Sequence, residues 1–411
     1  MSTPPTASPN DASSYLQAGT TDYRLANLAV FLGGFACFAM LYGTQPLLPL
    51  LAQVFGASAT EVSLSVSVST GALALTLIPA SLLSDRFGRG PMMTLSLAAA
   101  AALSLLCPWV TSFDQLLVLR ALLGVALAGL PAAAMAYLGE EVAPNAQGRA
   151  MGLYIAGNAF GGMTGRFLTA WVTDIANWQI ALLVLGILGA VAALAFWFGL
   201  PASRHFRRRS ISPAQVLADT RALLRDAGLP WLFLCAFLLM GSFVGLYNFV
   251  TFRLVAPPFG LGQTAIGAIF LLYLVGTWSS AWVGQLVDRI GRRQVLGIMA
   301  GLMLAGLLLT LPAQLGWVVI GIAVFTFGFF GAHTTTSGWV SRRAGTSRAL
   351  AAAVYLSSYY LGSSVLGTTV GLAWEAGRWP AVVGLLVALV AGVLLLARHL
   401  ARIPRIATQP A

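Results

Sequence analysis

The chain has 411 residues, of which 58% are hydrophobic and only 9% are charged, and its mean hydropathy is +0.84. A soluble globular domain carries about 25% charged residues, so this composition excludes an ordinary soluble protein and indicates one that is embedded in a membrane. The formal net charge is +11. Because the basic residues are scattered over short segments between apolar runs, we predict no nucleic-acid partner.

The first segment, residues 1–24, is rich in Ser, Thr, Pro and Ala, and this composition predicts a disordered tail. No basic stretch precedes a short apolar one here, so we do not expect a cleaved signal peptide. Twelve apolar runs follow, each of about the length that an α-helix needs to cross ~30 Å of hydrocarbon. They are Ala26–Leu50, Val62–Leu83, Pro91–Trp109, Leu116–Leu138, Ala150–Val172, Ile180–Leu200, Pro230–Val255, Ala265–Val287, Val295–Leu311, Trp317–Trp339, Ala349–Leu372 and Ala381–Ala397.

These runs predict an all-α, polytopic membrane protein with two pseudo-symmetric bundles of six helices, at 25–200 and 230–398, and a second tail at 399–411. The linker at 201–229 is the one long polar connection, and its Ser212-Pro213 pair is typical of a helix start. We expect a short amphipathic helix there, lying on the lipid bilayer as a tether between the bundles.

Arginine is distributed unevenly over the segments between the runs. All 23 basic residues are arginine, and 19 of them lie in the tails and in the loops on one side, whereas the opposite loops carry only Arg378. Basic residues are retained on the cytoplasmic side of a membrane. We therefore predict that both termini and the linker are cytoplasmic.

One short charged segment, which we call the cassette, occurs twice, each time between two apolar runs. Its copies are Asp85-Arg86-Phe87-Gly88-Arg89 and Asp288-Arg289-Ile290-Gly291-Arg292-Arg293. The aspartates of the two copies, Asp85 and Asp288, are 288 − 85 = 203 positions apart, which is about half of the chain. A duplicated turn of this kind predicts a transporter built from two related halves. Within the first copy, Gly88 permits a tight turn, and the arginines can pair with the acids Glu140 and Glu141. The simpler alternative is a basic turn that only determines topology.

The cassette resembles the loop signature of the major facilitator superfamily, Gly-x-x-x-Asp-Arg-x-Gly-Arg-basic-basic. The second copy matches it from Gly284 to Arg293, whereas the first has Ser81 and Gly90 at two of its positions. The stretch Arg120-Ala-Leu-Leu-Gly124 resembles the Arg-x-x-x-Gly motif of the family. A third stretch resembles the antiporter signature Gly-Pro-x-x-Gly-Gly with Asn158 in place of proline, and its glycines are Gly157, Gly161 and Gly162.

Longer strings, such as Gly276-Thr-Trp-Ser-Ser280, are similar to the YnfM-type transporters of bacterial inner membranes. The resemblance implies the major facilitator fold, a multi-pass protein of the inner (plasma) membrane and a transport activity, and we expect it to act as a monomer. It also implies that the cassettes form a conformational latch, whose residues are Asp85, Arg86, Gly88, Arg89, Asp288, Arg289, Gly291 and Arg292.

Two arginines interrupt the apolar runs. An arginine within a bilayer costs at least about 2.5–3.5 kcal/mol, so it normally faces the protein interior or water. No acidic residue lies deep within any run, which leaves backbone carbonyls, water or an anionic substrate as partners of Arg120 and Arg166. The resemblance links Arg120 to proton transfer, and the alternative for Arg166 is an arginine that reaches the outer surface. His333 is a candidate proton carrier, with a structural histidine as the alternative.

Further candidates for the substrate or proton pathway are uncharged polar or aromatic residues within the runs, namely Tyr42, Gln45, Asn158, Asn248, Tyr273, Trp278, Ser357, Ser358 and Tyr359. The sequence contains no metal-ligand spacing, cofactor motif or nucleotide loop, so we predict neither an enzyme nor a metal or cofactor. The favoured function is proton-coupled efflux, by antiport, of a small organic compound such as a drug or metabolite. The alternatives are uptake of an organic anion held by Arg120, and a membrane sensor or scaffold that transports nothing.

Overall fold

The computed structural model describes residues 15–208 and 212–403, so parts of the predicted tails, at 1–14 and 404–411, lie outside it. Its secondary structure is helical throughout these residues, apart from one isolated bridge between Leu16 and Val142. The helices of the first half are α2 (Thr21–Tyr42), α3 (Leu48–Phe55), α4 (Ala59–Phe87), α5 (Arg89–Leu106), α6 (Phe113–Leu127), α7 (Gly129–Glu141), α8 (Gln147–Ile175) and α9 (Trp178–Gly199).

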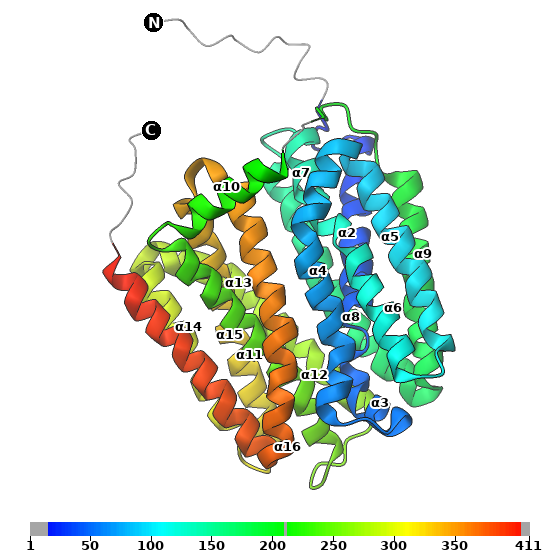
Figure 1. Ribbon diagram of the computed structural model, residues 1–411, viewed down its shortest axis with the longest axis vertical. Coiled ribbons are helices and arrows are strands. Elements are labelled where there is room, and N and C mark those ends of the chain that lie inside the picture. Colours follow the sequence, from blue (N-terminus) through cyan, green and yellow to red (C-terminus); the bar gives the residue numbers. More distant parts are fainter. Residues whose placement is uncertain (1–14, 209–211, 404–411) are drawn as a thin grey trace, which may run out of the picture.

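The linker contains α10 (Pro213–Leu224), which begins with the Ser212 side chain accepting a hydrogen bond from the backbone N–H of Gln215. The helices of the second half are α11 (Leu229–Val255), α12 (Gln263–Ile269), α13 (Tyr273–Ile290), α14 (Arg292–Leu309), α15 (Leu315–Arg343) and α16 (Arg348–Arg402). Figure 1 shows the two halves side by side, with α10 at one end of the molecule.

The number of membrane crossings follows from three observations. Ten helical stretches in the described residues are long and apolar enough to span a bilayer. One of them, α16, consists of two helices, because the backbone leaves the helical conformation at Gly377 and Arg378. The less apolar α8, with 29 residues, is the remaining crossing and packs along α2. The predicted all-α fold with twelve transmembrane helices is thus confirmed.

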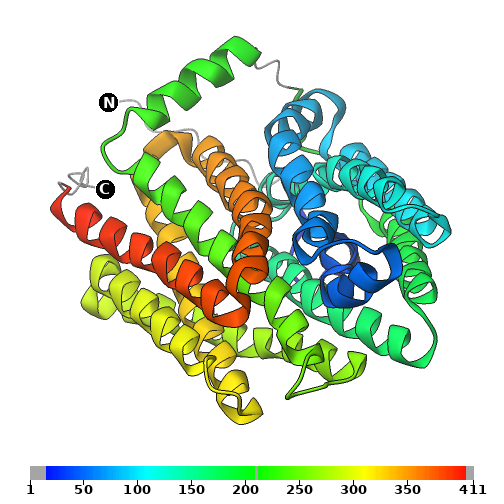
Figure 2. The ribbon, with the colours of Figure 1, turned by 60° about the horizontal axis from the view of Figure 1, so that its bottom comes forward.

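We call the end that carries α10 the tail side; it is the upper end in Figure 1. The opposite side carries α3 and α12. Figure 2, which turns this opposite side forward, separates the blue and cyan helices of the first half from the yellow and orange helices of the second.

Each half contains one very close crossing of two helices, which glycine makes possible. A Cβ atom on Gly161 of α8 would lie 2.0 Å from the carbonyl oxygen of Phe35 in α2. A Cβ atom on Gly362 of α16 would lie 2.0 Å from the carbonyl oxygen of Phe237 in α11. Since real Cβ atoms never approach this closely, both crossings need glycine, and the internal repeat is visible in the packing as well as in the turns.

Polar contacts join the two halves from the middle of the bundle to the opposite side. The hydroxyl of Thr368 donates to that of Ser67 at 2.6 Å, and the Ser363 hydroxyl donates to that of Thr70 at 3.3 Å. Nearer the opposite side, the Asp174 carboxylate accepts the Thr264 hydroxyl at 2.5 Å. Within the described residues, no ion pair joins the halves on the tail side. The structure is therefore closed toward α3 and α12.

Candidate functional site

Arg120 holds three helices of the first half together. Its guanidinium, 2% exposed, donates to the carbonyl oxygens of Ser65 at 2.8 Å and Met40 at 2.7 Å, and also to that of Leu41. The backbone oxygen of Arg120 accepts the Ser69 hydroxyl at 2.8 Å. All three guanidinium nitrogens of Arg120 are thus bonded to the backbone of α2 and α4, which satisfies the buried charge without an acid.

Arg166 is also buried, with 2% of its surface exposed, so it does not reach the outer surface. Its Nε donates to the side-chain oxygen of Gln45 at 2.6 Å, and its Nη1 donates to the carbonyl oxygen of Gly162 at 2.6 Å. Its Nη2 makes no hydrogen bond, and no acid pairs with it, within the described part of the chain. Arg166 therefore differs from Arg120 in keeping one donor group open.

Aromatic rings from both halves surround the Arg166 guanidinium. The carbon atom Cζ lies 4.2 Å from the ring centroid of Tyr42, 5.0 Å from that of Tyr273 and 5.3 Å from that of Phe270. Such rings attract a cation through their electron-rich faces, most strongly where water is excluded. The hydroxyl of Tyr273 is buried and has no hydrogen-bond partner among the described residues.

Gln45 connects Arg166 to the second half. While its side-chain oxygen accepts from Arg166, its Nε2 donates to the side-chain oxygen of Asn248 at 2.7 Å. The amide nitrogen of Asn248 then donates to the carbonyl oxygen of Gly367 at 3.3 Å. This line of hydrogen bonds crosses from α8 to α11 and α16. We call its side chains and the surrounding rings the Arg166 cluster: Tyr42, Gln45, Arg166, Asn248, Phe270 and Tyr273.

His333 lies in an aromatic group of the second half that Phe329 and Phe330 connect to Tyr273 of the Arg166 cluster. Its Nδ1 is 2.9 Å from the hydroxyl of Tyr355, and its ring centroid is 4.7 Å from that of Tyr359. Ser337, one turn further along the same helix, donates to the carbonyl oxygen of Thr334. In the described part of the chain, no hydrogen bond joins His333 to Arg120 or Arg166, so the structure does not bring these three predicted residues into direct contact.

The antiporter-like glycines place α8 directly against α2. A Cβ atom on Gly157 would lie 2.4 Å from the Phe31 carbonyl oxygen, and one on Gly162 would lie 3.1 Å from Nη1 of Arg166. These glycines therefore bring the two helices together beside Arg166. Asn158, on the same helix, has a buried side-chain oxygen with no hydrogen-bond partner in the described residues.

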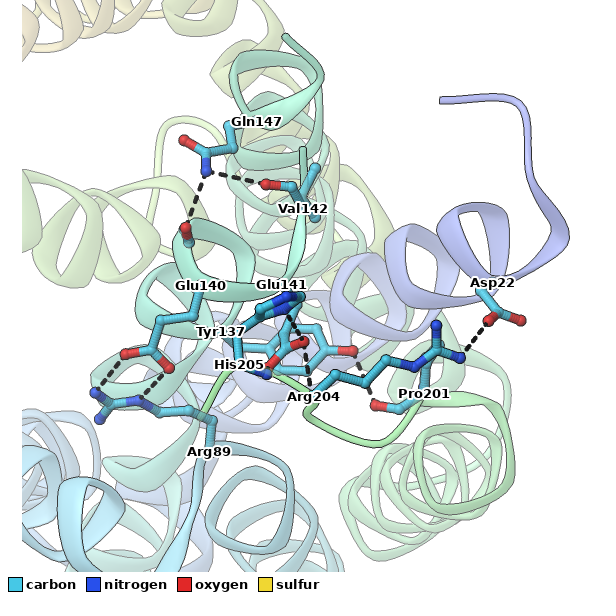
Figure 3. Close-up of polar contacts among 11 residues, drawn as sticks. Asp22, Arg89, Tyr137, Glu140, Glu141, Val142, Gln147, Pro201, Arg204 and His205 are labelled. Atoms are coloured by element: carbon cyan, nitrogen blue, oxygen red, sulfur yellow. Dashed lines mark hydrogen bonds and ion pairs between the residues drawn. The ribbon is translucent and has the colours of Figure 1, made fainter. Parts of the chain in front are cut away.

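The first cassette is part of a charged cluster on the tail side, shown in Figure 3. Arg89 pairs with Asp85 at 2.5 Å and with Glu140 at 3.0 Å. The neighbouring carboxylate of Glu141, which is 2% exposed, accepts the backbone N–H groups of Arg204 at 2.9 Å and His205 at 3.0 Å. The end of α7 thus fixes both the cassette and the start of the linker.

The second cassette has the same turn but different partners. Gly291 has φ +86° and ψ 151°, close to the φ +107° and ψ 149° of Gly88. Asp288 and Arg289 are exposed, and neither forms an ion pair among the described residues. Arg293 donates to two carbonyl oxygens at the end of α16, those of Ala401 and Ile403.

The sequence missed several members of these groups. Phe270 lies against Arg166, but the sequence does not distinguish it from other apolar residues of the spans. The ion pair between Asp226 and Arg343, at 2.5 Å, joins two charges that look like any others in polar loops. Gln45, Asn248 and Tyr273 were expected only as polar or aromatic residues within spans. No group of three or more potential metal ligands occurs in the described residues.

Comparison with known proteins agrees with this architecture. The family model of the Major Facilitator Superfamily matches residues 30–367. The chain is 42% identical over 388 residues to the uncharacterized MFS-type transporter YybF of Bacillus subtilis, covering 94% of this chain and 96% of that one. It is 42% identical over 382 residues to the inner membrane transport protein YnfM of Escherichia coli, covering 93% and 91% of the two chains.

Among solved structures, the chain resembles a bacterial homologue of the human lysosomal transporter Spinster in an inward-facing and occupied conformation. The TM-score is 0.74 with 17% sequence identity, and the match covers 93% of this chain and 97% of the other, which shows a shared fold. The paired six-helix halves, the duplicated turn and these matches lead to one conclusion: the chain belongs to the major facilitator superfamily of secondary transporters.

Proposed function

We propose that this transporter exports a small organic compound, such as a drug or a metabolite, in exchange for protons, and that it works by alternating access. The observation that carries the proposal is the Arg166 cluster, which contains a buried cation with an open donor at the junction of the halves. A group in this position can bind a solute and sense the separation of the halves. The glycine-rich α8 and the likeness to YnfM support the antiporter assignment.

Uptake of an organic anion is the second candidate, and Arg166 favours an anionic solute over a cationic one. Arg120 suits this role less well, since all three of its nitrogens are bonded to backbone oxygens. For the coupling proton, we propose His333, which shares a hydrogen bond with Tyr355, as the carrier. We further propose that the protein is a monomer in the bacterial inner membrane, with both termini cytoplasmic.

Direction and coupling are tested together in vesicles. A strain lacking its main efflux systems is screened for compounds whose toxicity falls when the wild-type chain is expressed but not when Arg166→Gln is expressed. Those compounds are then assayed in inside-out vesicles, where export appears as uptake that an inwardly acidic gradient drives. Accumulation only in right-side-out vesicles would favour uptake instead. Absence of flux in both preparations, with protein present in the membrane, would favour the sensor or scaffold.

A further inference from the structure

We infer that Arg166 binds the carboxylate of a planar aromatic cargo, and that this binding releases the Gln45–Asn248 hydrogen bond that joins the halves. The inference rests on the proposed transport function. It adds the chemical class of the cargo and the step that connects binding to opening of the side that is closed in the structure.

The charge of the Arg166 cluster indicates an anion. A buried guanidinium needs a compensating partner, and here the described residues supply only the neutral oxygens of Gln45 and Gly162 together with aromatic faces. The Tyr273 hydroxyl, on a residue that is 7% exposed, is a further donor without a partner in the described chain. The buried hydroxyl of Tyr42 likewise has no partner in the described chain, so three open donors and a positive charge match a carboxylate, which is an acceptor only.

The rings around Arg166 favour a flat apolar body on that carboxylate. Half-buried Phe38 lies next to Tyr42, with centroids 6.4 Å apart, and half-buried Phe330 lies next to Tyr273, with centroids 5.9 Å apart. These two rings therefore extend the aromatic surface of the cluster beyond its enclosed part. Aromatic groups prefer offset or edge-to-face contact with one another, so a planar ring fits this surface better than a branched aliphatic chain.

The geometry of the guanidinium connects binding to the junction of the halves. A carboxylate that binds side-on takes two parallel N–H groups, one from Nε and one from Nη2. Nη2 of Arg166 is open, but Nε is bonded to Gln45, so a side-on carboxylate must displace the Gln45 oxygen. The charge-assisted hydrogen bond between the guanidinium and a carboxylate is stronger than the hydrogen bond to the Gln45 amide oxygen that it replaces. Once displaced, Gln45 no longer has the position from which Nε2 reaches Asn248.

The first test compares matched ligands on the purified full chain. The probes are 2-naphthoate and 2-naphthamide, which differ in charge and share the ring system, and binding is followed by thermal stabilisation. We expect wild-type protein to bind the carboxylate about tenfold or more tightly than the amide, and Arg166→Gln to lose this preference. Equal binding of the two probes by wild-type protein would overturn the inference. This comparison uses wild-type protein alone, so it does not depend on whether a variant folds.

The second test places the carboxylate within the chain. Gln45→Glu puts an acid on Arg166 and removes the donor to Asn248, so it should reproduce the bound state; Gln45→Leu removes the same donor without adding charge. Spin labels at the exposed positions Gln53 in α3 and Ala265 in α12 report the separation of the halves on the closed side.

We expect both Gln45 variants to populate longer label distances than wild-type protein. Only Gln45→Glu should lose naphthoate binding, because its own carboxylate occupies Arg166. Wild-type distances in both variants would contradict the coupling step. Transport that shows no preference for carboxylates over neutral or cationic compounds would refute this cargo class while leaving the transport function standing, whereas absence of all flux would remove the proposed function itself.

Discussion

The two cassettes have the same backbone conformation at their glycine turn, but their charged side chains have different surroundings. Gly88 and Gly291 have nearly the same dihedral angles, yet Asp85 and Arg89 are buried against Glu140 whereas Asp288 is exposed. The difference arises at the end of the fourth helix of each half. Glu140 is followed 203 positions later by a residue of opposite charge, Arg343 (140 + 203 = 343).

This inversion redirects the ion pairs. In the first half, the acid at the end of α7 binds the cassette. In the second half, Arg343 at the end of α15 forms no ion pair with the cassette among the described residues and pairs with Asp226 of the linker instead. Arg342, next to it, is a like-charged neighbour of Arg292. The duplication thus preserved a turn that glycine alone can adopt, while the electrostatic role of that turn depends on one residue far away in sequence.

The largest predicted contrast concerns the cassette arginines. Arg89→Gln leaves Asp85 and Glu140 without their cation, and breaking a largely buried pair costs about 3 kcal/mol. Arg292→Gln removes a half-buried charge beside another arginine and should change stability by no more than about 0.5 kcal/mol. Thermal unfolding midpoints in one detergent compare the two variants. Equal losses would mean that the second cassette has a partner that the structure does not reveal.

A smaller effect, and one that should be common to both copies, follows from the turn itself. Alanine in place of Gly88 or Gly291 must adopt a positive φ with extended ψ, a conformation that costs about 1–3 kcal/mol. The two substitutions should lower the unfolding midpoint by similar amounts. If only Gly88→Ala is harmful, contact with its neighbours, and not the backbone conformation, is what the glycine provides.

The latch hypothesis predicts a shift between states without a loss of folding. If Asp85 favours the state that is closed to the tail side, Asp85→Asn should increase, by a few-fold, the labelling of a cysteine at Asn158 by reagents applied from that side. Asp288→Asn is the matched change in the exposed copy and should have the weaker effect. Unchanged labelling together with full transport would leave the first cassette as a topology signal.

The smallest effect is confined to acid pH. Partial burial tends to raise the pKa of Asp226, but the hydrogen bonds from Arg343 and from the N–H groups of Gly228 and Leu229 outweigh it and lower the pKa below its usual range. Stabilisation by this carboxylate is therefore complete above the unfolded pKa of about 3.9 and is lost as pH falls through the lower folded value. The unfolding midpoint of Asp226→Asn should lie below that of wild-type protein at pH 7 and approach it at strongly acid pH; a gap that persists there would exclude this linkage.

Features that depend on neighbouring residues were predictable, and those that depend on distant ones were not. Hydropathy and the repeated turn led to the twelve spans and the fold, because span length and glycine turns are local properties. The sequence also singled out Arg120 and Arg166 as costly intramembrane charges. It could not separate them, because Arg120 is satisfied by carbonyl oxygens 55 to 80 positions away, whereas Arg166 meets a glutamine 121 positions away. Backbone oxygens exist at every position, so no sequence pattern reveals which of them an arginine will meet.

The anchoring of the linker has a consequence for how the polypeptide can be divided. Glu141 holds Arg204 and His205 on the first half, and Arg343 holds Asp226 on the second. Each half thus retains its own anchor when the covalent connection between His205 and Ser212 is cut. Among the described residues, seven hydrogen bonds still join the halves: two from Thr264 and one each from Gln45, Thr60, Gln263, Ser363 and Thr368. We therefore expect two co-expressed fragments divided at this point to assemble, which would make each half available for separate isotope labelling.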